Sequence, residues 1–350
     1  MNQRVLVGMS GGVDSSATAL VLLRAGYQVS GVTMLLHREA GSCGSGKEAE
    51  DAANVCRQLG IPHTILDFSR EFSEHVTRYF VSEYLAGRTP NPCIMCNQHL
   101  KFGALLEYAI QNGFDYVATG HYALIEKLGS RWGLKRSPAA KDQSYVLYRL
   151  SQEQLSRTLT PLGNLEKAQA RKLAEEAGLA VAHKPDSQDI CFIPDGDYNR
   201  YIARVTGKEP EPGDFVGLDG KILGKHQGIT RYTIGQRKGL GISFGEPMYV
   251  TKIDPLSNQV TLGPEGSQYA KGLLAGDVNW VSIAPPSAPF SAQVKVRYQA
   301  PPSPALITPL TDGRVKIEFE HPQRSVTPGQ AAVFYQGDLV AGGGTILCPC

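Results

Sequence analysis

The residues best suited to chemistry come early in the chain, in the segment 9–16, which reads MSGGVDSS. The apolar run 5–7 before it predicts a buried strand, and the largely apolar run 17–25 after it predicts a helix. A strand, a tight glycine turn and the start of a helix together present bare backbone N–H groups to a phosphate. Gly11 and Gly12 permit positive φ angles and a close approach of ligand to backbone. We therefore predict that this segment binds the phosphates of a nucleotide.

Asp14 is the unexpected member of the segment, because a carboxylate repels phosphate. Its presence predicts a Mg²⁺ ion that it binds and that bridges to the nucleotide. The competing interpretation is a glycine-rich turn before an ordinary helix, which the serine and aspartate pattern directly after the first strand disfavours. A second glycine-rich segment, 41–47, fits most of a Walker A loop, but Glu48 stands where that loop needs Ser or Thr. We predict a mobile linker there instead.

A pair of cysteines at C-x-x-C spacing, Cys93 and Cys96, forms the second chemical feature. Pro90 and Pro92 stiffen an extended segment before them. We predict that a helix begins directly after the pair, with Asn97 as its N-cap. A thiol at a helix N-terminus has its thiolate stabilised by the helix dipole, so its pKa is lowered. Such a thiol suits a nucleophile or a metal ligand.

The remaining cysteines are more ordinary. Cys191 lies beside apolar residues after a polar turn, and a single cysteine of this kind is more often a small buried residue than a functional one. We predict that Cys43 and Cys56 are loop and core residues, and that Cys348 and Cys350 belong to a frayed tail. A four-cysteine zinc site would need a second C-x-x-C, which the sequence lacks.

Composition restricts the class of protein. The chain has 350 residues, of which 42% are hydrophobic, and no apolar run approaches the roughly 20 residues of a membrane span. The sequence passes directly into its first strand without a signal peptide, so we expect a cytoplasmic protein with no membrane contact. The 35 Lys and Arg residues nearly balance the 33 Asp and Glu residues, so bulk charge does not indicate a nucleic-acid binder. Seven cysteines without a signal peptide argue against a secreted disulfide scaffold.

The order of predicted elements indicates an α/β protein with a β-rich second half. The first half alternates strands and helices, which is typical of a parallel sheet covered by helices. The expected strands are 29–36, 63–68 and 116–119, and the expected helices are 47–59, 71–86, 101–111 and 164–177, the last capped by Asn164. Glycine and proline then become dense, period-two alternation predicts strands at 293–298 and 315–319, and a further β-like run lies at 332–335. We predict linkers near Gly207 and Gly272, and therefore three domains at 1–206, 207–271 and 272–350.

The segment 9–16 resembles the PP-loop of the ATP pyrophosphatases, which split ATP between its α- and β-phosphates. Further sequence blocks resemble one branch of that superfamily. These blocks are NPCIMCN at 91–97, TGHY at 119–122, KDQSY at 141–145, ICFI at 190–193, GQRKGLG at 235–241 and PGQAAVFY at 328–335. Together they resemble the bacterial tRNA-specific 2-thiouridylases (MnmA/TrmU type), over about residues 5–346.

The resemblance implies a fold and a set of binding residues. It implies an N-terminal PP-loop domain with a parallel sheet, like that of the adenine nucleotide α-hydrolases, then a small central domain and a C-terminal β-barrel that binds tRNA. The residues expected to bind ATP are Gly8, Met9, Ser10, Gly11, Gly12, Val13, Asp14 and Ser15, with Met34 and Gly120 near the adenosine. Those expected to touch tRNA are Asn91, Pro92, Cys93, Lys141, Asp142, Gln143, Arg297 and Tyr298. The last two also offer a cation and a ring on one predicted strand.

The resemblance further implies thiolation of the wobble uridine of certain tRNAs, with release of AMP and pyrophosphate. Cys191 would carry sulfur as a persulfide, supplied by a cysteine desulfurase or a sulfur-relay protein. Cys96 would assist sulfur release and leave a Cys96–Cys191 disulfide. Much of the family has an aspartate where this chain has Cys93. Cys93, Cys96 and Cys191 therefore also resemble the ligand set of related thiolases that hold a [4Fe–4S] cluster, and both mechanisms stay open.

Other PP-loop enzymes provide the competing predictions. An amide-forming synthetase that uses ammonia, or a tRNA lysidine synthetase, has no need of three placed thiols. A non-catalytic RNA-binding module leaves the PP-loop pattern unexplained. The sequence does not indicate which tRNAs are modified, which protein supplies sulfur, or the oligomeric state.

Overall fold

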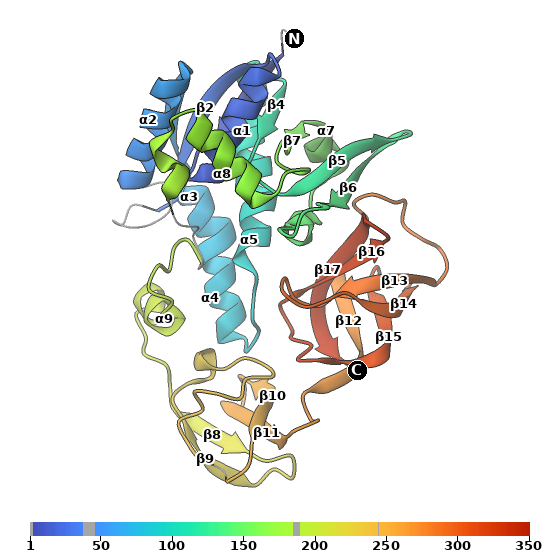
Figure 1. Cartoon of the computed structure of the whole chain (residues 1–350). Coiled ribbons are helices and arrows are strands. Elements are labelled where there is room, and N and C mark those ends of the chain that lie inside the picture. Colours follow the sequence, from blue (N-terminus) through green and yellow to red (C-terminus); the bar gives the residue numbers. More distant parts are fainter. Residues whose placement is uncertain (1–2, 38–45, 185–189, 244) are drawn as a thin grey trace.

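The computed structural model describes residues 3–37, 46–184, 190–243 and 245–350 (Figure 1). Figure 1 shows a helix-covered sheet that carries the N-terminus, a small central sheet beyond the far end of helix α4, and a barrel that carries the C-terminus. The predicted linker and Walker A resemblance at 41–47 fall largely outside the described residues. This arrangement confirms the expected class, which is an α/β unit followed by two β-rich units.

The N-terminal sheet is wholly parallel and has the strand order β3-β2-β1-β4-β7. Its strands are β1 (Arg4–Gly8), β2 (Gln28–Leu35), β3 (His63–Asp67), β4 (Tyr116–Ala118) and β7 (Thr158–Leu159). The chain moves outward from β1 to one side and then returns to the other side at β4. Ligands of open parallel sheets bind outside the carboxyl ends of the strands at such a reversal point. The topology therefore places a binding site at the ends of β1 and β4.

Helices cover both faces of this sheet because residues along β1 alternate between the two faces. Val5 and Val7 pack against α1 (Val13–Arg24), α2 (Lys47–Leu59) and α8 (Lys167–Glu176). Leu6 packs on the opposite face, against residues of α6 (Leu105–Gln111). The predicted cap of α8 was wrong. Glu166, not Asn164, is the N-cap, and it forms a reciprocal capping box with Gln169.

Two long helical stretches contain π-helical segments. The first consists of α3 (Ser69–Phe72), a π-helical segment (Ser73–Thr77) and α4 (Arg78–Leu85). The second consists of α5 (Pro92–Met95), a π-helical segment (Cys96–Ala104) and α6. Isolated π-helical turns occur often at functional sites, and the second stretch carries the C-x-x-C pair. The shorter helices are α7 (Gln152–Ser156), α9 (Tyr198–Thr206) and the 3₁₀ turns Ser144–Leu147, Ala180–His183 and Ile229–Arg231.

The central unit is a four-stranded sheet in the order β10-β11-β8-β9. Its strands are β8 (Gly213–Val216), β9 (Ile222–His226), β10 (Met248–Asp254) and β11 (Gln259–Pro264). The chain enters it after Gly207, whose φ of 66° ends helix α9 in a left-handed conformation that glycine adopts without strain. Phe215, Val250 and Val260 are buried in its own small core. The sequence therefore correctly predicted a β-rich segment here.

The C-terminal strands close into a barrel in the order β12-β15-β14-β13-β16-β17, with β17 returning to pair with β12. They are β12 (Tyr269–Asn279), β13 (Phe290–Lys295), β14 (Ser303–Pro309), β15 (Val315–Arg324), β16 (Ala331–Gln336) and β17 (Leu339–Pro349). The hairpin β5 (Ala123–Leu128) and β6 (Arg131–Arg136) extends this sheet from the N-terminal unit, through a pairing of Lys135 with Leu339. The barrel was expected, but this extension was not.

The predicted frayed tail was wrong. Cys348 pairs with Leu274 of β12, and Cys350 exchanges two backbone hydrogen bonds with Gly272. Gly272, which we expected in a linker, is itself inside β12. A long-range strand pairing stabilises both segments, and no local pattern reports such a pairing. None of the helices in the described ranges is long and apolar enough to span a bilayer.

Candidate active site

The PP-loop runs from the carboxyl end of β1 to the start of α1. Gly11 has a φ of 65°, and a Cβ there would lie 2.4 Å from the Glu48 carbonyl oxygen, so only glycine suits this position. Gly12 is extended, with a φ of −112°, so our prediction of a positive φ holds for Gly11 alone. Gly12 is the N-cap of α1 and has no side chain to cap the helix. The first-turn N–H groups are therefore available to an anion at the helix N-terminus.

The serine hydroxyls mostly hold the loop together. The Ser15 hydroxyl accepts from the Ser10 N–H at 3.2 Å and donates to the Gly12 carbonyl at 3.1 Å. Ser16 donates to the same carbonyl at 2.9 Å. Ser15 and Ser16 are buried, whereas Ser10 is exposed. The predicted hydroxyl donors thus divide into a supporting pair and one that faces solvent.

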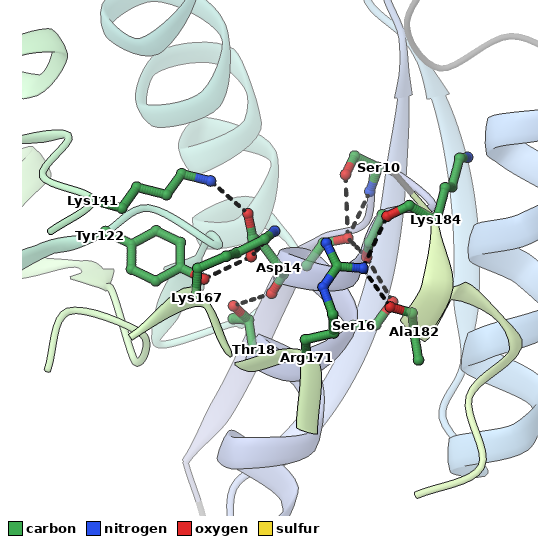
Figure 2. Close-up of polar contacts among 12 residues, drawn as sticks. Ser10, Asp14, Ser16, Thr18, Tyr122, Lys141, Lys167, Arg171, Ala182 and Lys184 are labelled. Atoms are coloured by element: carbon green, nitrogen blue, oxygen red, sulfur yellow. Dashed lines mark hydrogen bonds and ion pairs between the residues drawn. The ribbon is translucent and has the colours of Figure 1, made fainter. Parts of the chain in front are cut away.

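Asp14 is the centre of a polar cluster beside the loop (Figure 2). Its Oδ1 accepts from the Tyr122 hydroxyl at 2.7 Å and from Lys167 Nζ at 2.8 Å, and its Oδ2 accepts from Lys141 Nζ at 3.1 Å. Gly120 closes the site from the end of β4, because a Cβ there would lie 2.8 Å from the Asp14 Cβ. Lys141 was expected to contact tRNA, and Lys167 was not among the predicted site residues. No motif surrounds Lys167, and only its place in the fold indicates a role.

Lys184 fastens the other side of the loop. Its Nζ donates to the Gly11 carbonyl at 3.1 Å and to Asp51 at 2.9 Å. Arg171 of α8 donates to the carbonyls of Ala182 and Lys184 at 2.6 and 3.2 Å. The chain that leads toward Cys191 is therefore anchored on the PP-loop immediately before the segment 185–189.

The helix that carries the C-x-x-C pair begins earlier than we predicted. Its N-cap is Asn91, whose side chain accepts the Cys93 N–H at 3.2 Å, and Pro92 occupies the first helical position, which proline favours. Asn97 is not a cap, because it is buried and donates to the Val146 carbonyl at 3.0 Å. Both cysteines consequently lie in the first turns of the helix, where the dipole favours a thiolate. Cys93 is exposed, and Cys96 is buried.

The segment around Cys191 packs beside Cys96. Cys191 is exposed, whereas Phe192 and Ile193 are buried in a hydrophobic cluster that also contains Cys96. Met34, at the carboxyl end of β2, packs against the same cluster. The fold thus brings together three segments that the sequence separates widely.

The three cysteines proposed as cluster ligands are not arranged as a metal site. Cys93, Cys96 and Cys191 all lie in the described part of the chain, and there no group of three or more His, Cys, Asp or Glu side chains is arranged to hold a metal ion. The helix presents Cys93 to solvent and Cys96 to the hydrophobic cluster. The iron–sulfur alternative from the sequence analysis is therefore unsupported.

The residues expected to touch tRNA occupy different surroundings. Asp142 accepts from the N–H groups of Ser137 and Ser144 at 3.2 and 3.0 Å, and Gln143 bonds both backbone groups of Tyr122. Their side chains shape the segment that presents Lys141 to Asp14. Asp142 and Gln143 therefore make their hydrogen bonds within the protein.

Arg297 and Tyr298 lie in a turn after β13, not on an alternating strand as predicted. Arg297 donates to the Ile234 carbonyl at 2.9 Å and to the Thr327 hydroxyl, and it thereby joins the central unit to the barrel. Tyr298 is half-buried. Burial raises its pKa, and the negative charges of Asp142 and of a Cys93 thiolate add to that shift. The effect of Cys93 on Tyr298 indicates that these two side chains lie near one another.

His121 is buried beside the same site, and its Nδ1 bonds the Thr119 hydroxyl at 2.8 Å. Burial lowers its pKa well below the usual value, and the charges of Lys101 and Lys141 lower it further. A buried imidazole that is kept neutral in this way fits a structural role.

Family models match the chain in three consecutive parts. They are described as a tRNA methyl transferase HUP domain over residues 3–195, a tRNA methyl transferase PRC-barrel domain over 199–264, and an aminomethyltransferase beta-barrel domain over 270–346. Two bacterial proteins are similar along their whole length. The tRNA-specific 2-thiouridylase of Acetivibrio thermocellus is 50% identical over 355 residues, which is 98% of this chain and 99% of that protein. That of Clostridioides difficile is also 50% identical, over 99% of this chain and 98% of its own length.

Likeness to solved structures is weaker. A 4-thiouridine synthetase in complex with RNA and ATP superposes with a TM-score of 0.37 and 19% identity, over 52% of this chain and 43% of that one. A score this low does not establish a common fold.

Proposed function

The chain belongs to the family of tRNA-specific 2-thiouridylases, and on that premise we propose how its residues divide the reaction. It is a sulfurtransferase of the PP-loop class that acts on tRNA and uses ATP. The proposal concerns the residues that bind ATP, the thiols that carry sulfur, and the surface that receives the target uridine, which we take to be the wobble base.

ATP binds, in this proposal, at the carboxyl ends of β1, β2 and β4. The residues we assign to it are Gly8, Met9, Ser10, Gly11, Gly12, Val13, Asp14 and Ser15, with Met34 and Gly120 near the adenosine. Two observations support this assignment: the loop ends at an uncapped helix N-terminus, and it lies where the strand order reverses.

Mg²⁺ accompanies ATP in PP-loop enzymes, and Asp14 is the side chain we assign to it. A carboxylate is the donor type that Mg²⁺ prefers. Both oxygens of Asp14 already accept hydrogen bonds, from Lys141, Lys167 and Tyr122. These bonds place two donors on Oδ1 and one on Oδ2, and each carboxylate oxygen has two acceptor sites, so Oδ2 is the oxygen we assign to the ion. When bound, the ion would screen phosphate charge.

The first chemical step is adenylation. The uracil C2 oxygen attacks the α-phosphorus of ATP, the bond from that phosphorus to the bridging oxygen breaks, and pyrophosphate leaves with the electron pair. The product carries AMP on C2, which converts a poor leaving oxygen into a good one. The N–H groups at the start of α1 are placed to stabilise charge that develops on the phosphates.

The second step transfers sulfur. The terminal sulfur of a Cys191 persulfide attacks C2, and the C2–O bond breaks to release AMP. The Cys96 thiolate then attacks Sγ of Cys191, which breaks the persulfide S–S bond, leaves sulfur on C2, and forms a Cys96–Cys191 disulfide. An external dithiol reduces this disulfide, and a cysteine desulfurase or relay protein reloads Cys191. The single observation that carries this assignment is the packing of Cys96 and the neighbours of Cys191 in one hydrophobic cluster.

The tRNA surface, in the same proposal, comprises Asn91, Cys93 and Tyr298, and Pro92, which is buried, shapes it from below. Lys141, Asp142, Gln143 and Arg297 support that surface from behind, because their side chains make contacts within the protein. A single-stranded anticodon base is recognised by stacking and polar contacts, which Tyr298 and Asn91 can supply. We place the reaction in the cytoplasm, since its substrate is tRNA.

A thiolation assay on unmodified tRNA tests the assignment of the thiols. The chain is purified without air, analysed for iron, and compared with Cys93→Ala, Cys96→Ala and Cys191→Ala. We expect no iron, no thiolation by the variants at Cys96 and Cys191, and retained activity in Cys93→Ala. Bound iron together with a requirement for all three thiols would replace the persulfide route with cluster-bound sulfide.

A further inference from the structure

The segment that leads into the helix of the C-x-x-C pair is held by the other two units of the chain. It comprises residues 87–90, between α4 and α5, and Figure 1 shows this connection at the end of α4 that faces the central sheet. A Cβ on Gly87 would lie 2.9 Å from Cγ2 of Ile253 in β10, and the Thr89 hydroxyl donates to that of Thr233 at 3.2 Å. The central unit therefore contacts this short segment at two points.

The barrel holds the same segment through the turn before β16. The Thr89 N–H donates to the Pro328 carbonyl at 2.9 Å. The Gln330 amide returns two hydrogen bonds, from Nε2 to the Thr89 carbonyl at 2.8 Å and to the Pro90 carbonyl at 3.3 Å. Gly329 packs closely against the same backbone, because a Cβ on it would lie 3.0 Å from both the nitrogen and the oxygen of Thr89. Hydrogen bonds and a close backbone contact therefore join the barrel to residues 89 and 90.

The turn before β16 is itself fixed to the barrel. The Gly329 N–H donates to the Ile346 carbonyl at 2.9 Å, and the Ile346 N–H donates to the Gln330 carbonyl at 2.8 Å. Ile346 lies on β17 and is fully buried in the barrel core. The turn therefore moves only together with β17, and segment 87–90 follows the position of the barrel.

The residues held in this way come directly before the C-x-x-C helix. Asn91 follows Pro90 and is the N-cap, whose side chain accepts the Cys93 N–H at 3.2 Å. Ile94, in the first turn, is buried in a hydrophobic cluster that also contains Ala331 of the barrel. The start of the helix therefore takes its position from the barrel as well as from its own unit.

We propose that Gln330 and Gly329 are positioning residues for sulfur transfer, which place the C-x-x-C helix so that the barrel sets where Cys96 lies. Each acts through the backbone of Thr89 and not on the reacting atoms. The inference rests on the proposed function, in which Cys96 attacks Sγ of Cys191. Placement matters in that step, because an error of about 1 Å lowers a catalytic rate by roughly 100-fold.

Gln330→Met tests the hydrogen bonds, because methionine has nearly the length of glutamine and no N–H donor. The matched control is Gln323→Met, which removes an amide that donates at 2.7 Å to a carbonyl within the barrel, that of His321. The full chain is assayed for thiolation of unmodified tRNA and, without tRNA, for alkylation of Cys96 by iodoacetamide. We expect Gln330→Met to lower kcat roughly 10- to 100-fold with an unchanged KM for ATP. Labelling of buried Cys96 should become several times faster because the first turn opens more often, whereas Gln323→Met should match wild type in both assays.

Gly329→Ala supplies a second test, which pushes segment 87–90 away instead of releasing it. Gly329 has a φ of 90°, so its control is Gly337→Ala, at a φ of 60°, where a Cβ would meet no atom of the described residues within 4 Å. Both substitutions strain a left-handed backbone, but only Gly329 faces Thr89. We expect only Gly329→Ala to slow thiolation and to speed the labelling of Cys96.

A wild-type kcat together with wild-type protection of Cys96, in both Gln330→Met and Gly329→Ala, would overturn the proposal and make the junction purely structural. An equal loss of kcat in Gln330→Met and Gln323→Met would also overturn it, since the loss would then follow from weakening the barrel. A wild-type chain that did not thiolate tRNA would contradict the proposed function instead, and the labelling of Cys96 would still decide whether the barrel positions the helix.

Discussion

Gly120 offers the sharpest steric test of the active site. It follows β4 and lies against the first turn of α1, where a Cβ would be 2.8 Å from the Asp14 Cβ and 2.9 Å from the Asp14 carbonyl carbon. One of these neighbours is backbone, which cannot rotate away as a flexible side chain could. The substitution Gly120→Ala must therefore move either the turn or the start of α1.

The size of the movement follows from these distances. Carbon atoms in contact prefer about 3.5–4.0 Å, so the two segments must separate by roughly 0.7–1.2 Å. Overpacking of this kind costs about 1–3 kcal/mol of unfolding free energy. The displacement also breaks the geometry of the hydrogen bond from Tyr122 to Asp14, which is 2.7 Å long. A misplacement of about 1 Å lowers a catalytic rate by roughly 100-fold.

Thermal unfolding without nucleotide, followed by a pyrophosphate-release assay with tRNA, measures both effects. The control is Gly8→Ala at the end of β1, where a Cβ meets the Ala118 carbonyl oxygen and the Thr119 methyl group at ordinary distances of 3.8 and 3.9 Å. We expect Gly120→Ala to lower the unfolding midpoint by roughly 3–10 °C and to release pyrophosphate roughly 100-fold more slowly. The nucleotide-free midpoint of Gly8→Ala should stay near that of wild type.

The reasoning fails if Gly120→Ala unfolds at the wild-type temperature and keeps the wild-type rate. That result would mean that the contact between the turn and α1 is loose enough to absorb a methyl group. If both alanine variants unfolded equally early, the loss would reflect glycine removal in general and not the approach to Asp14.

Burial raises the pKa of Cys56 to about 11. Alkylation of the native chain at pH 8, followed by peptide mass spectrometry, should therefore label exposed Cys93 and spare Cys56. Equal labelling of the two cysteines would contradict the burial of Cys56. Asn91→Ala removes an N-cap and should lower the unfolding free energy, measured by chemical denaturation, by about 0.5–2 kcal/mol. Asn91→Ser should keep most of that free energy. An alanine variant as stable as wild type would show that the cap is dispensable. Burial lowers the pKa of His121 below the usual 6.5, so the unfolded chain binds more protons as pH falls through 6.5, and stability should decline toward pH 5. His121→Asn should flatten that decline, and an identical slope in both proteins would rule out His121 as its source.

Local pattern was enough for the elements that carry strong signals. The PP-loop, the strand before it and the helix after it all follow from glycine placement and apolar runs. The helix at 47–59 appears at its predicted bounds for the same reason. The errors occurred where two residues competed for one role. We predicted Asn97 as the cap, but Asn91 is the cap, and the proline after it occupies the first helical position.

Strand and tail errors have a different cause. The sequence alternation runs to residue 298, but β13 ends at Lys295. Arg297, beyond that end, bonds the Ile234 carbonyl of the central unit and not a neighbouring strand. The pairing of Cys350 with Gly272 across the closing strands of the barrel turns an apparent tail into part of β17. Both outcomes depend on partners far away in the chain.

The sequence by itself determined the chemistry that is available: a phosphate-binding turn, two thiols near a helix start, and a third thiol after a polar turn. It did so because glycine, cysteine and capping residues act through their immediate neighbours. Only the tertiary structure decided which groups meet. Lys141 and Lys167 lie 127 and 153 residues beyond Asp14, yet both contact its carboxylate. These contacts depend on how α8 and the turn before Ser144 pack against α1. Packing between distant segments produces no periodic pattern in the sequence.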